Sequence, residues 1–367
     1  MLPALGYSSD TGMSLGVAAV ATRLAPDAVP FVWRISAQIA ASFKVDANGH
    51  VTVPVTDNYA RVDLPWTHGL RFRGDLRVYS QRDCGWYGLG NASPAASPDD
   101  VVWRYGRASP SLRLELWREI GHHLRAFGGA SGSYSDLDIA PGSRLAADIA
   151  GASGPVVSEA LVATQDHAVA EGFAGMMVDS RDDESWPTHG QLHDVSLRGG
   201  IATDGQAYGG ADLTLRGFLP IGTPKVVLAG QLLGDMLFGH PPFYELARHG
   251  GAFPQDSPGG QFGPRGVPLQ RYHGAGKVLA EVEVRTMLIP FHLLGLDWAL
   301  GPIGFADAGR VWARLEPTPE LDGTGLGLHV GMGGGLRLRM GEGVVVRGDF
   351  GWSPEGTGLY LDLGNTF

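Results

Sequence analysis

The C-terminal residues 344–367 alternate between apolar and polar side chains, in two runs separated by a turn rich in Gly, Pro and Ser. The apolar face of the first run holds Val344, Val346, Phe350 and Trp352, and that of the second holds Leu359, Leu361, Leu363 and Phe367. Period-two alternation predicts β-strand, and two such runs joined by a turn predict a hairpin. A face this regularly apolar must be covered by a second protein layer or by lipid.

The same alternation recurs along the chain. It is clearest in residues 31–44, 71–79, 111–117 and 277–285, where one face is mainly apolar and the other carries charges of both signs. A soluble β-sandwich also alternates, but here the pattern repeats from end to end and no run is apolar on both faces. We therefore predict an all-β fold, a transmembrane antiparallel β-barrel of about 16 strands with a hydrated lumen.

The predicted strands begin with 11–23 and end with 357–367, and the least regular of them is 155–168. Together they make residues 1–367 a single transmembrane β-barrel domain. Two connections are long: residues 135–154, in which we expect a helical turn around Leu145–Ile149, and residues 239–275, which have no strand pattern. A segment as long as the second is usually functional or disordered.

The composition is consistent with this fold. The chain has 56 Gly and 24 Pro, which suit many turns, and no uncharged apolar run reaches the 18 residues of a transmembrane helix. The net charge of −10 disfavours a nucleic-acid partner, whose phosphates require clustered cations. Cys84 is the single cysteine, so neither an intramolecular disulfide nor a cysteine-based zinc site can form.

The first residues, MLPALGYSSDTG, lack the basic start and the apolar core of a signal peptide. Taken alone, this start indicates a cytoplasmic protein, which conflicts with the barrel pattern. We therefore expect that a leader, and any N-terminal domain, lie outside this sequence.

One motif lies inside the second long connection. It reads Pro264-Arg265-Gly266-Val267-Pro268, and it is followed by a predicted strand that contains Glu283 and by a run FADAGRVW that contains Asp307. A guanidinium in a barrel lumen needs a partner, and a carboxylate that accepts two hydrogen bonds is the best one. The alternative is that Arg265 is a solvated loop residue.

This order of motifs resembles the BamA/TamA family of outer-membrane barrels, the bacterial surface antigen or outer-membrane assembly superfamily. The runs GYSSDTG (6–12), WYGLGNAS (86–93) and VDSRDDESWPTHG (178–190), with the terminal hairpin, extend the resemblance over the whole chain. Pro264 and Val267 depart from the family pattern, which has an aliphatic and an aromatic residue there. No POTRA domain precedes the barrel in this chain.

The resemblance implies that the long extracellular loop, 239–275, folds into the lumen and plugs it. Arg265 and Gly266 would form its locking motif by meeting Glu283 and Asp307, and Arg285 is a further donor that could balance the charge. The glycine-rich run 331–339 would let another segment lie close to the wall. Leu361, Leu363 and Phe367 would form the C-terminal signature at the barrel seam, with Phe367 as a lipid-facing anchor or as part of an assembly signal.

The function that the resemblance implies is insertion or translocation of outer-membrane or surface proteins in a Gram-negative bacterium. The first and last strands would close the barrel with few hydrogen bonds, so that a client strand could enter between them. The alternative is a passive pore, or a membrane anchor for a larger protein such as a patatin-like lipase. A soluble all-β binding protein is a third hypothesis.

The partners expected in the outer membrane are lipopolysaccharide and phospholipid, client outer-membrane proteins, and a periplasmic POTRA or lipase domain outside this chain. No catalytic motif is found, so we expect no enzyme activity and no cofactor. We interpret the histidines as turn and rim residues rather than metal ligands; they include His122 with His123, His189 with His193, and His240 with His249.

Overall fold

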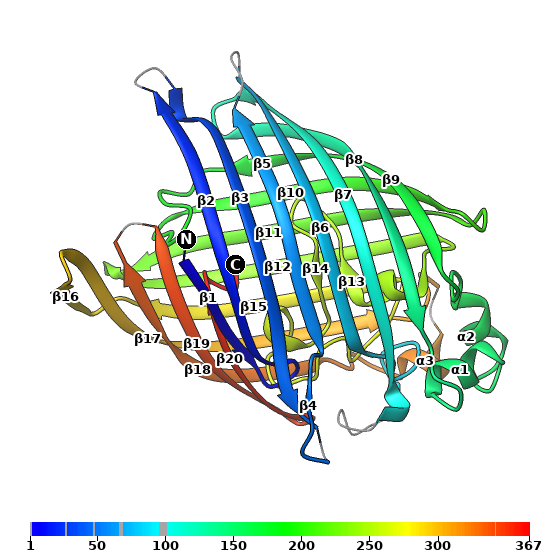
Figure 1. The fold of residues 1–367 in the computed structure, drawn as a ribbon. Coiled ribbons are helices and arrows are strands. Elements are labelled where there is room, and N and C mark those ends of the chain that lie inside the picture. The colour runs from blue at the N-terminus through cyan, green and yellow to red at the C-terminus, as the bar shows by residue number, and fades with distance from the viewer. Residues whose placement is uncertain are drawn as a thin grey trace.

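A computed structural model of the protein describes residues 2–25, 28–46, 48–65, 69–94, 101–316, 318–341 and 343–367. Within these residues, sixteen strands pair in antiparallel order and close into a β-barrel (Figure 1). The strands are β1 (Leu2–Ser8), β2 (Gly12–Ala25), β3 (Ala28–Val45), β5 (Val55–Pro65), β6 (Leu70–Gly85), β7 (Arg104–Gly121), β8 (Leu124–Asp138), β9 (His167–Asp179), β10 (Gly190–Ala202), β11 (Ala207–Ile221), β12 (Thr223–Gly239), β15 (Gly276–Thr286), β17 (Leu296–Trp312), β18 (His329–Met340), β19 (Val344–Ser353) and β20 (Gly356–Leu363).

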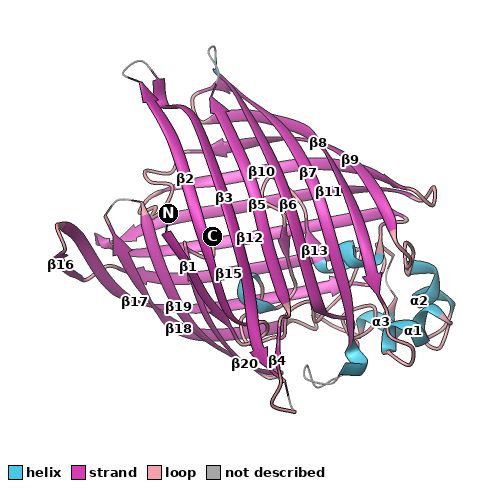
Figure 2. Cartoon of the chain, viewed as in Figure 1, coloured by secondary structure: helices cyan, strands magenta, loops and turns pink. Residues whose placement is uncertain are grey.

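The remaining elements are short. Four are strands: β4 (Val51–Thr52), β13 (Arg248–His249), β14 (Gln255–Asp256) and β16 (Ile289–Leu293). The helices are η2 (Val101–Trp103), α1 (Arg144–Ile149), α2 (Pro155–Ala160), η3 (Phe243–Ala247), η4 (Gly260–Phe262) and α3 (Pro319–Asp322). Helices α1, α2 and α3 gather at one end of the barrel, which we call the loop end (Figure 2). The opposite end, where β1 begins, is the terminal end.

None of the helices within the described residues has the length and apolar character needed to cross a membrane.

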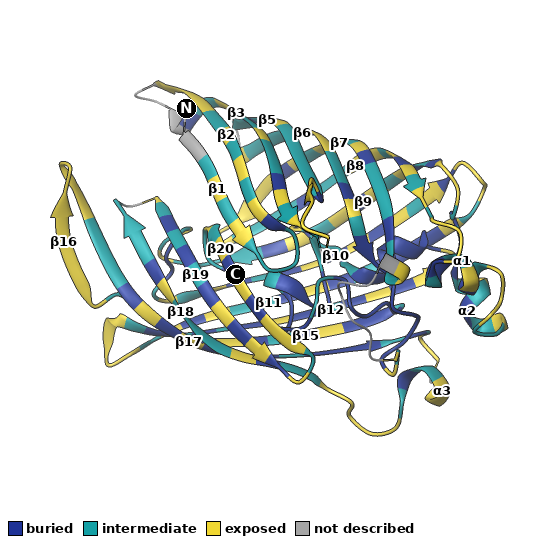
Figure 3. Cartoon of the chain, turned by 60° about the horizontal axis from the view of Figure 1, so that its bottom comes forward, coloured by how far each residue is buried: buried dark blue, intermediate teal, exposed yellow. Residues whose placement is uncertain are grey.

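Alternation in the sequence becomes alternation in exposure. On β15, Val282 and Val284 are 48% and 41% exposed, whereas Glu283 and Arg285, which alternate with them, are buried. Figure 3 shows the same alternation of exposed and buried residues along the barrel strands. The apolar side chains therefore point outward and the charged ones inward, as a membrane barrel requires. The predicted all-β barrel is confirmed.

The strand count of sixteen agrees with the prediction because two errors cancel. The first strand is β1, so the predicted strand 11–23 is the second one; Leu2–Ser8 is short and its small residues obscure the alternation. The predicted strand 155–168 was wrong, because Pro155 begins helix α2 after Gly154. Val157 and Leu161, four residues apart, are both buried, which is helical spacing.

The predicted helical turn around Leu145–Ile149 is confirmed as α1. The side chain of Ser143 caps this helix by accepting a hydrogen bond from the backbone N–H of Ala146.

An apolar cluster covers the loop end. Its aromatic members are Trp86, Tyr105, Tyr208, Phe243 and Tyr244, and the cluster also holds Leu145 of α1 and Val157 of α2. The indole N–H of Trp86 donates a hydrogen bond to Asp148 on α1, at 2.9 Å. With Ala313 and Leu321 of the β17–β18 connection, the cluster draws residues from four connections and packs them against one another.

A cavity of about 1620 Å³ lies on the terminal side of these loops. Its walls include inward-facing residues of β5–β11, many of them arginines, residues of β1 and of the C-terminal segment 361–367, and Phe253, Gln255 and Phe262 of the long connection. The lumen is therefore polar, and the segment between β12 and β15 borders it.

Candidate functional site

Arg265 lies in the connection between β12 and β15 and is completely buried. Its Nε and Nη2 atoms donate to the two oxygens of Asp307, each at 2.8 Å, and its backbone N–H donates to the same carboxylate at 3.1 Å. Its Nη1 atom donates to Glu283 at 2.7 Å. Arg265 is thus bound to both carboxylates with which the sequence associated it, and Asp307 accepts from it in bidentate geometry.

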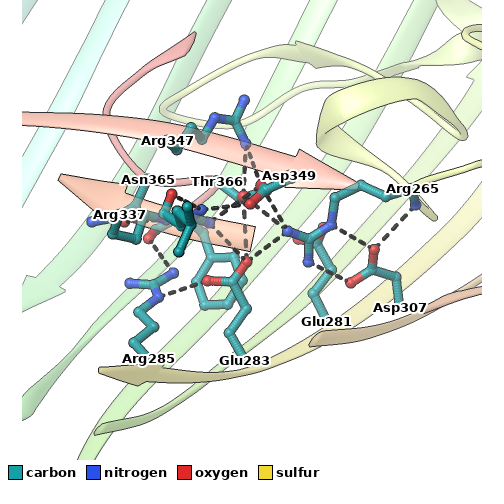
Figure 4. Close-up of polar contacts among 12 residues, drawn as sticks. Arg265, Glu281, Glu283, Arg285, Asp307, Arg337, Arg347, Asp349, Asn365 and Thr366 are labelled. Carbon is teal, nitrogen blue, oxygen red and sulfur yellow. Dashed lines mark hydrogen bonds and ion pairs between the residues drawn. The ribbon is translucent and has the colours of Figure 1, made fainter. Parts of the chain in front are cut away.

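The cluster is larger than these three residues (Figure 4). Asp349 of β19 accepts from Arg265 at 3.2 Å and from Arg337 of β18 at 2.5 Å. The second oxygen of Glu283 accepts from Arg285 at 2.7 Å. Arg347 lies 3.7 Å from Asp349 and completes the set. The buried group therefore joins the long connection to β15, β17, β18 and β19.

The surroundings of Arg265 favour its charged form. Burial by itself lowers the pKa of the guanidinium, but hydrogen bonds and charges from Asp307 and Glu283 reverse that effect and hold the pKa well above its usual value. The ring of Phe305 lies under the guanidinium, with its centroid 3.4 Å from Cζ. Such stacking on an aromatic face is a favourable contact for arginine.

Glycines allow the backbone at Arg265 to lie against the wall. A Cβ atom at Gly331 would lie 2.3 Å from the carbonyl oxygen of Arg265, and one at Gly351 would lie 2.8 Å from its backbone carbon. Gly266 has φ +97°, and a Cβ there would lie 2.9 Å from the backbone of β19. The expectation that glycines in 331–339 admit another segment is confirmed at Gly331.

The last residue, Phe367, does not lie on the face that the sequence predicted. Leu361 and Leu363 are exposed on the outer face as predicted, but Phe367 is only 9% exposed and faces the lumen. β20 ends at Leu363, and Gly364, with φ +90°, changes the chain direction. The interpretation of Phe367 as a lipid-facing anchor was wrong, because the strand period no longer applies beyond that turn.

The inward-turned C-terminal residues join the ionic cluster. The Phe367 ring packs against Phe218, and its main-chain oxygen accepts from Arg285 at 3.0 Å. The Thr366 hydroxyl accepts from Arg347 at 2.7 Å, and the Asn365 side chain accepts from Arg337 at 3.3 Å.

A second ionic row lies across four neighbouring strands. Arg198 of β10 binds Asp212 of β11 and, at 2.9 Å, Asp235 of β12. Asp235 also pairs with Lys277 of β15 at 2.7 Å. The backbone N–H of Gly250, in the long connection, donates to Asp235 at 2.9 Å. A Cβ atom at Gly250 would lie 1.4 Å from a guanidinium nitrogen of Arg198 and 2.5 Å from a carboxylate oxygen of Asp212, so a side chain there would have to displace this ion pair.

The strands that close the barrel are joined by few residue pairs. β1 and β20 pair at Tyr7 with Leu361 and at Ser8 with Tyr360, whereas seven pairs join β1 to β2 and eight join β19 to β20. On β1 these pairs lie next to the turn at the loop end, whereas on β20 they lie in the half of the strand nearer the terminal end. Along residues 2–6 of β1 no pairing with β20 is found among the described residues.

The long connection contacts both sides of this seam. The backbone N–H of Leu269 donates to Asp10, in the turn after β1, at 3.2 Å. Arg271 and Tyr272 donate to Glu355, in the turn before β20, at 2.9 and 2.7 Å. The long connection therefore bridges the two closing strands at the loop end.

Sequence reasoning missed several of these partners. Arg347 and Asp349 stand opposite the apolar face of the terminal hairpin, so their inward direction could be deduced from alternation. Arg337, directly opposite Arg347 in the β18–β19 register, and the row from Arg198 to Lys277 could not be assigned in that way. Their neighbours depend on the pairing of strands, which local periodicity does not encode.

Within the described residues there is no group of three or more His, Cys, Asp or Glu side chains placed to hold a metal ion. His122 and His123 lie in the β7–β8 turn, while His249 is buried beside the second ionic row.

No model of a known protein family matches this sequence, and no curated protein sequence matches it significantly. Among solved structures, the fold is similar to that of BamA from Haemophilus ducreyi lacking POTRA domains 1–3, with a TM-score of 0.58 and 14% identity. That likeness covers 99% of this chain and 69% of the BamA chain.

CdiB from Escherichia coli is also similar, with a TM-score of 0.57 and 11% identity over 98% of this chain and 62% of that chain. CdiB from Acinetobacter baumannii gives a TM-score of 0.53 and 14% identity over 98% of this chain and 58% of that one. At such identities the shared property is the fold. The resemblance to BamA/TamA family barrels is confirmed at that level.

Proposed function

We propose that this barrel, which shares its fold with BamA and CdiB, resides in the outer membrane of a Gram-negative bacterium and inserts or translocates other outer-membrane or surface proteins. Its aliphatic outer face fits lipid, and its polar lumen fits water and polypeptide. The partners we infer are membrane lipid, client proteins, and a POTRA or lipase domain that lies outside this chain.

The observation that carries this proposal is the seam. Among the described residues two residue pairs join β1 to β20, with one more backbone hydrogen bond from Ser9 to Leu359, fewer contacts than join either strand to its other neighbour. In a membrane every backbone N–H and C=O must find a partner inside the protein. The unpaired part of β1 is therefore a ready acceptor for another strand, by the same edge pairing that builds extended peptides onto sheets.

The contacts of the long connection suggest where opening begins. Leu269 and Arg271 hold the turns on the two sides of the seam at the loop end. The terminal end has no such bridge among the described contacts. A client strand would therefore enter from the terminal end and pair with residues 2–6 of β1, while the loop end stays closed.

The ionic cluster at Arg265 would act as a lock. It binds the long connection to four strands and to Thr366, next to the seam. We infer that this connection plugs the lumen and braces the wall while the seam opens. Arg265, Gly266, Glu283 and Asp307 are its proposed locking residues.

The test is a reversible crosslink across the seam. Tyr7 and Leu361 are directly opposite and both exposed, and paired residues in antiparallel strands have the Cα separation that a disulfide needs. Cys84→Ser would remove the native thiol, and Tyr7→Cys with Leu361→Cys would close the seam on oxidation. The matched control is Leu5→Cys with Leu15→Cys, which joins β1 to β2.

The assay is folding of a urea-unfolded eight-stranded outer-membrane barrel into proteoliposomes. We expect oxidation of the seam pair to abolish acceleration of folding, dithiothreitol to restore it, and the β1–β2 control to stay active. Acceleration that persists with the seam crosslinked would rule out entry between β1 and β20.

A passive pore is the second candidate, and the cavity of about 1620 Å³ is the observation that favours it. The same proteoliposomes separate the two functions. A passive pore would not accelerate client folding in either redox state, and its ion conductance would not depend on the seam disulfide.

A further inference from the structure

A hairpin projects from the barrel wall at the terminal end. β15 pairs with β12 as far as Thr286, where it lies opposite Val226. The chain then forms β16, which pairs only with the first residues of β17 among the described strands. Figure 3 shows this hairpin extending past its neighbours with exposed residues along β16.

The two faces of the hairpin differ. The pairs Ile289–Leu300, Phe291–Trp298 and Leu293–Leu296 form one apolar face. The rings of Phe291 and Trp298 are stacked at 6.0 Å, and the Trp298 N–H donates to the Leu293 carbonyl at 2.9 Å. The opposite face has the pairs Pro290–Ala299 and His292–Asp297, and the last two side chains are 3.1 Å apart.

The apolar face continues the outer surface of the barrel. Leu296, Trp298 and Leu300 alternate in phase with Pro302 and Gly304, which are exposed on the outer side of β17. Val282 and Val284 of β15 lie on the same side and are exposed too. No charged side chain interrupts the outer positions of β17 from Leu296 to Ala308. The hairpin thus carries the lipid-facing surface beyond the edge of β12.

The tip is apolar where water would favour a polar residue. Leu294 and Gly295 have φ of +54° and +75°, and Leu294 is 87% exposed. Two-residue hairpin turns of this kind favour Asn, Asp or Gly at the first position. A leucine with backbone angles in the left-handed region is strained. In water, an exposed leucine side chain gains no favourable contact that would offset this strain.

The free edge of β16 limits where the hairpin can lie. Unpaired strand edges do not occur in the hydrocarbon core, because their N–H and C=O groups would lack partners. Addition of a protein strand is also disfavoured, since Pro290 removes a donor from this edge. The remaining environment has water on one side and acyl chains on the other.

We propose that the β16–β17 hairpin lies in the interface of the leaflet at the terminal end, with its apolar face on phospholipid acyl chains. Trp298 occupies the headgroup level, where tryptophan is enriched. The hairpin acts as an amphipathic membrane anchor built from strands rather than from a helix. The hairpin continues β15 and β17, which carry Glu283 and Asp307. An anchored hairpin would therefore fix the depth of the ionic cluster in the membrane. This inference rests on the membrane location proposed above.

The test is the depth of a fluorophore at the tip. Leu294→Cys in a Cys84→Ser background would be labelled with bimane and reconstituted in phosphatidylethanolamine–phosphatidylglycerol vesicles. Val284→Cys, on the outer wall, is the lipid control. His122→Cys, in the exposed β7–β8 turn at the same end, is the aqueous control.

We expect the label at position 294 to be quenched by lipids brominated near the headgroup and to resist quenching by aqueous iodide. The label at position 122 should be quenched by iodide and not by the brominated lipids. Iodide quenching at 294 equal to that at 122 would overturn the proposal, and so would protection from iodide without lipid quenching. If the label at 284 also escapes lipid quenching, the membrane location itself is wrong.

Discussion

Arg265 shows how burial changes the role of an ion pair. Its side chain is fully buried and donates to Glu283, Asp307 and Asp349, so the loss of solvation is offset by hydrogen bonds to several carboxylates. Arg61 offers a contrast on the same barrel, because it pairs with Asp75 while about half of its side chain is exposed. The two arginines have similar partners and very different surroundings.

We predict that Arg265→Met destabilises the barrel by about 3–5 kcal/mol, because it leaves carboxylates buried without their counterion. Arg61→Met should change stability by about 0–1 kcal/mol, since its pair is exposed. The measurement is the temperature at which each variant loses its heat-modifiable migration in detergent gels. Equal shifts for both variants would show that Arg265 is not held as a buried charge.

Glu355 predicts a pH dependence. Burial by itself raises the pKa of Glu355. The hydrogen bonds from His329 and Tyr272 and the charge of Arg271 together lower it by more, so the pKa lies below the usual 4.5. A depressed carboxyl pKa contributes stability above the unfolded value, and that contribution is lost as the pH falls through the folded value.

Acidification below pH 4.5 should therefore release Arg271 and Tyr272 from the turn before β20. Pepsin cleavage beside Tyr272 should increase over that range, because pepsin is active at the acidity that protonates Glu355. Glu355→Gln should show raised trypsin cleavage after Arg271 at neutral pH and a flatter pepsin profile. An unchanged profile in this variant would assign the effect to another group.

At the level of elements, the long connection depends on close contact with the wall. Gly250 lies against the side chain of Arg198 and donates its N–H to Asp235, so an added methyl group would push the Arg198 guanidinium out of its ion pair. Gly217, on β11, has no atom within 4 Å of an added Cβ and no positive φ. The two glycines therefore separate the effect of crowding from the effect of an added methyl group.

Gly250→Ala should weaken docking of the connection by about 1–3 kcal/mol, the usual cost of overpacking. Limited proteolysis after Arg248 should become faster, while Gly217→Ala should digest like the wild-type protein. Similar digestion of Gly250→Ala and wild type would mean that the connection does not rest on the second ionic row.

At the level of the whole molecule, two ionic groups hold one connection against one wall. Lys277 and Glu283 lie six residues apart on β15, a distance of about 20 Å at ~3.3 Å per residue. Contacts this far apart contribute independently to stability. Loss of either group would therefore leave the connection attached at the other.

We predict that Arg265→Ala and Gly250→Ala each raise the conductance of the barrel in planar bilayers, and that the double variant conducts more than either. The reason is that each substitution releases a different part of the connection that borders the cavity. Arg61→Ala is the control and should conduct like wild type. A double variant that conducts no better than wild type would contradict the plugged lumen.

The sequence by itself determined the properties that depend on local periodicity. Alternation assigned most of the strands, placed Leu361 and Leu363 on the outer face, and predicted lipid as the cover of that face. The same alternation is enough to direct Arg347 and Asp349 inward. These conclusions follow from the two-residue period of a strand alone. The motif order added the association of Arg265 with Glu283 and Asp307, which the structure shows as hydrogen bonds.

Only the tertiary structure decided what depends on register and on chain direction between strands. It placed Phe367 in the lumen after the turn at Gly364, and it brought Arg198, Asp235 and Lys277 from three separate strands into one row. It also made β1 the first strand and, among the described residues, paired β1 with β20 at two positions. Such contacts join residues far apart in the chain, so closure of the barrel, and not the period of any one strand, selects them.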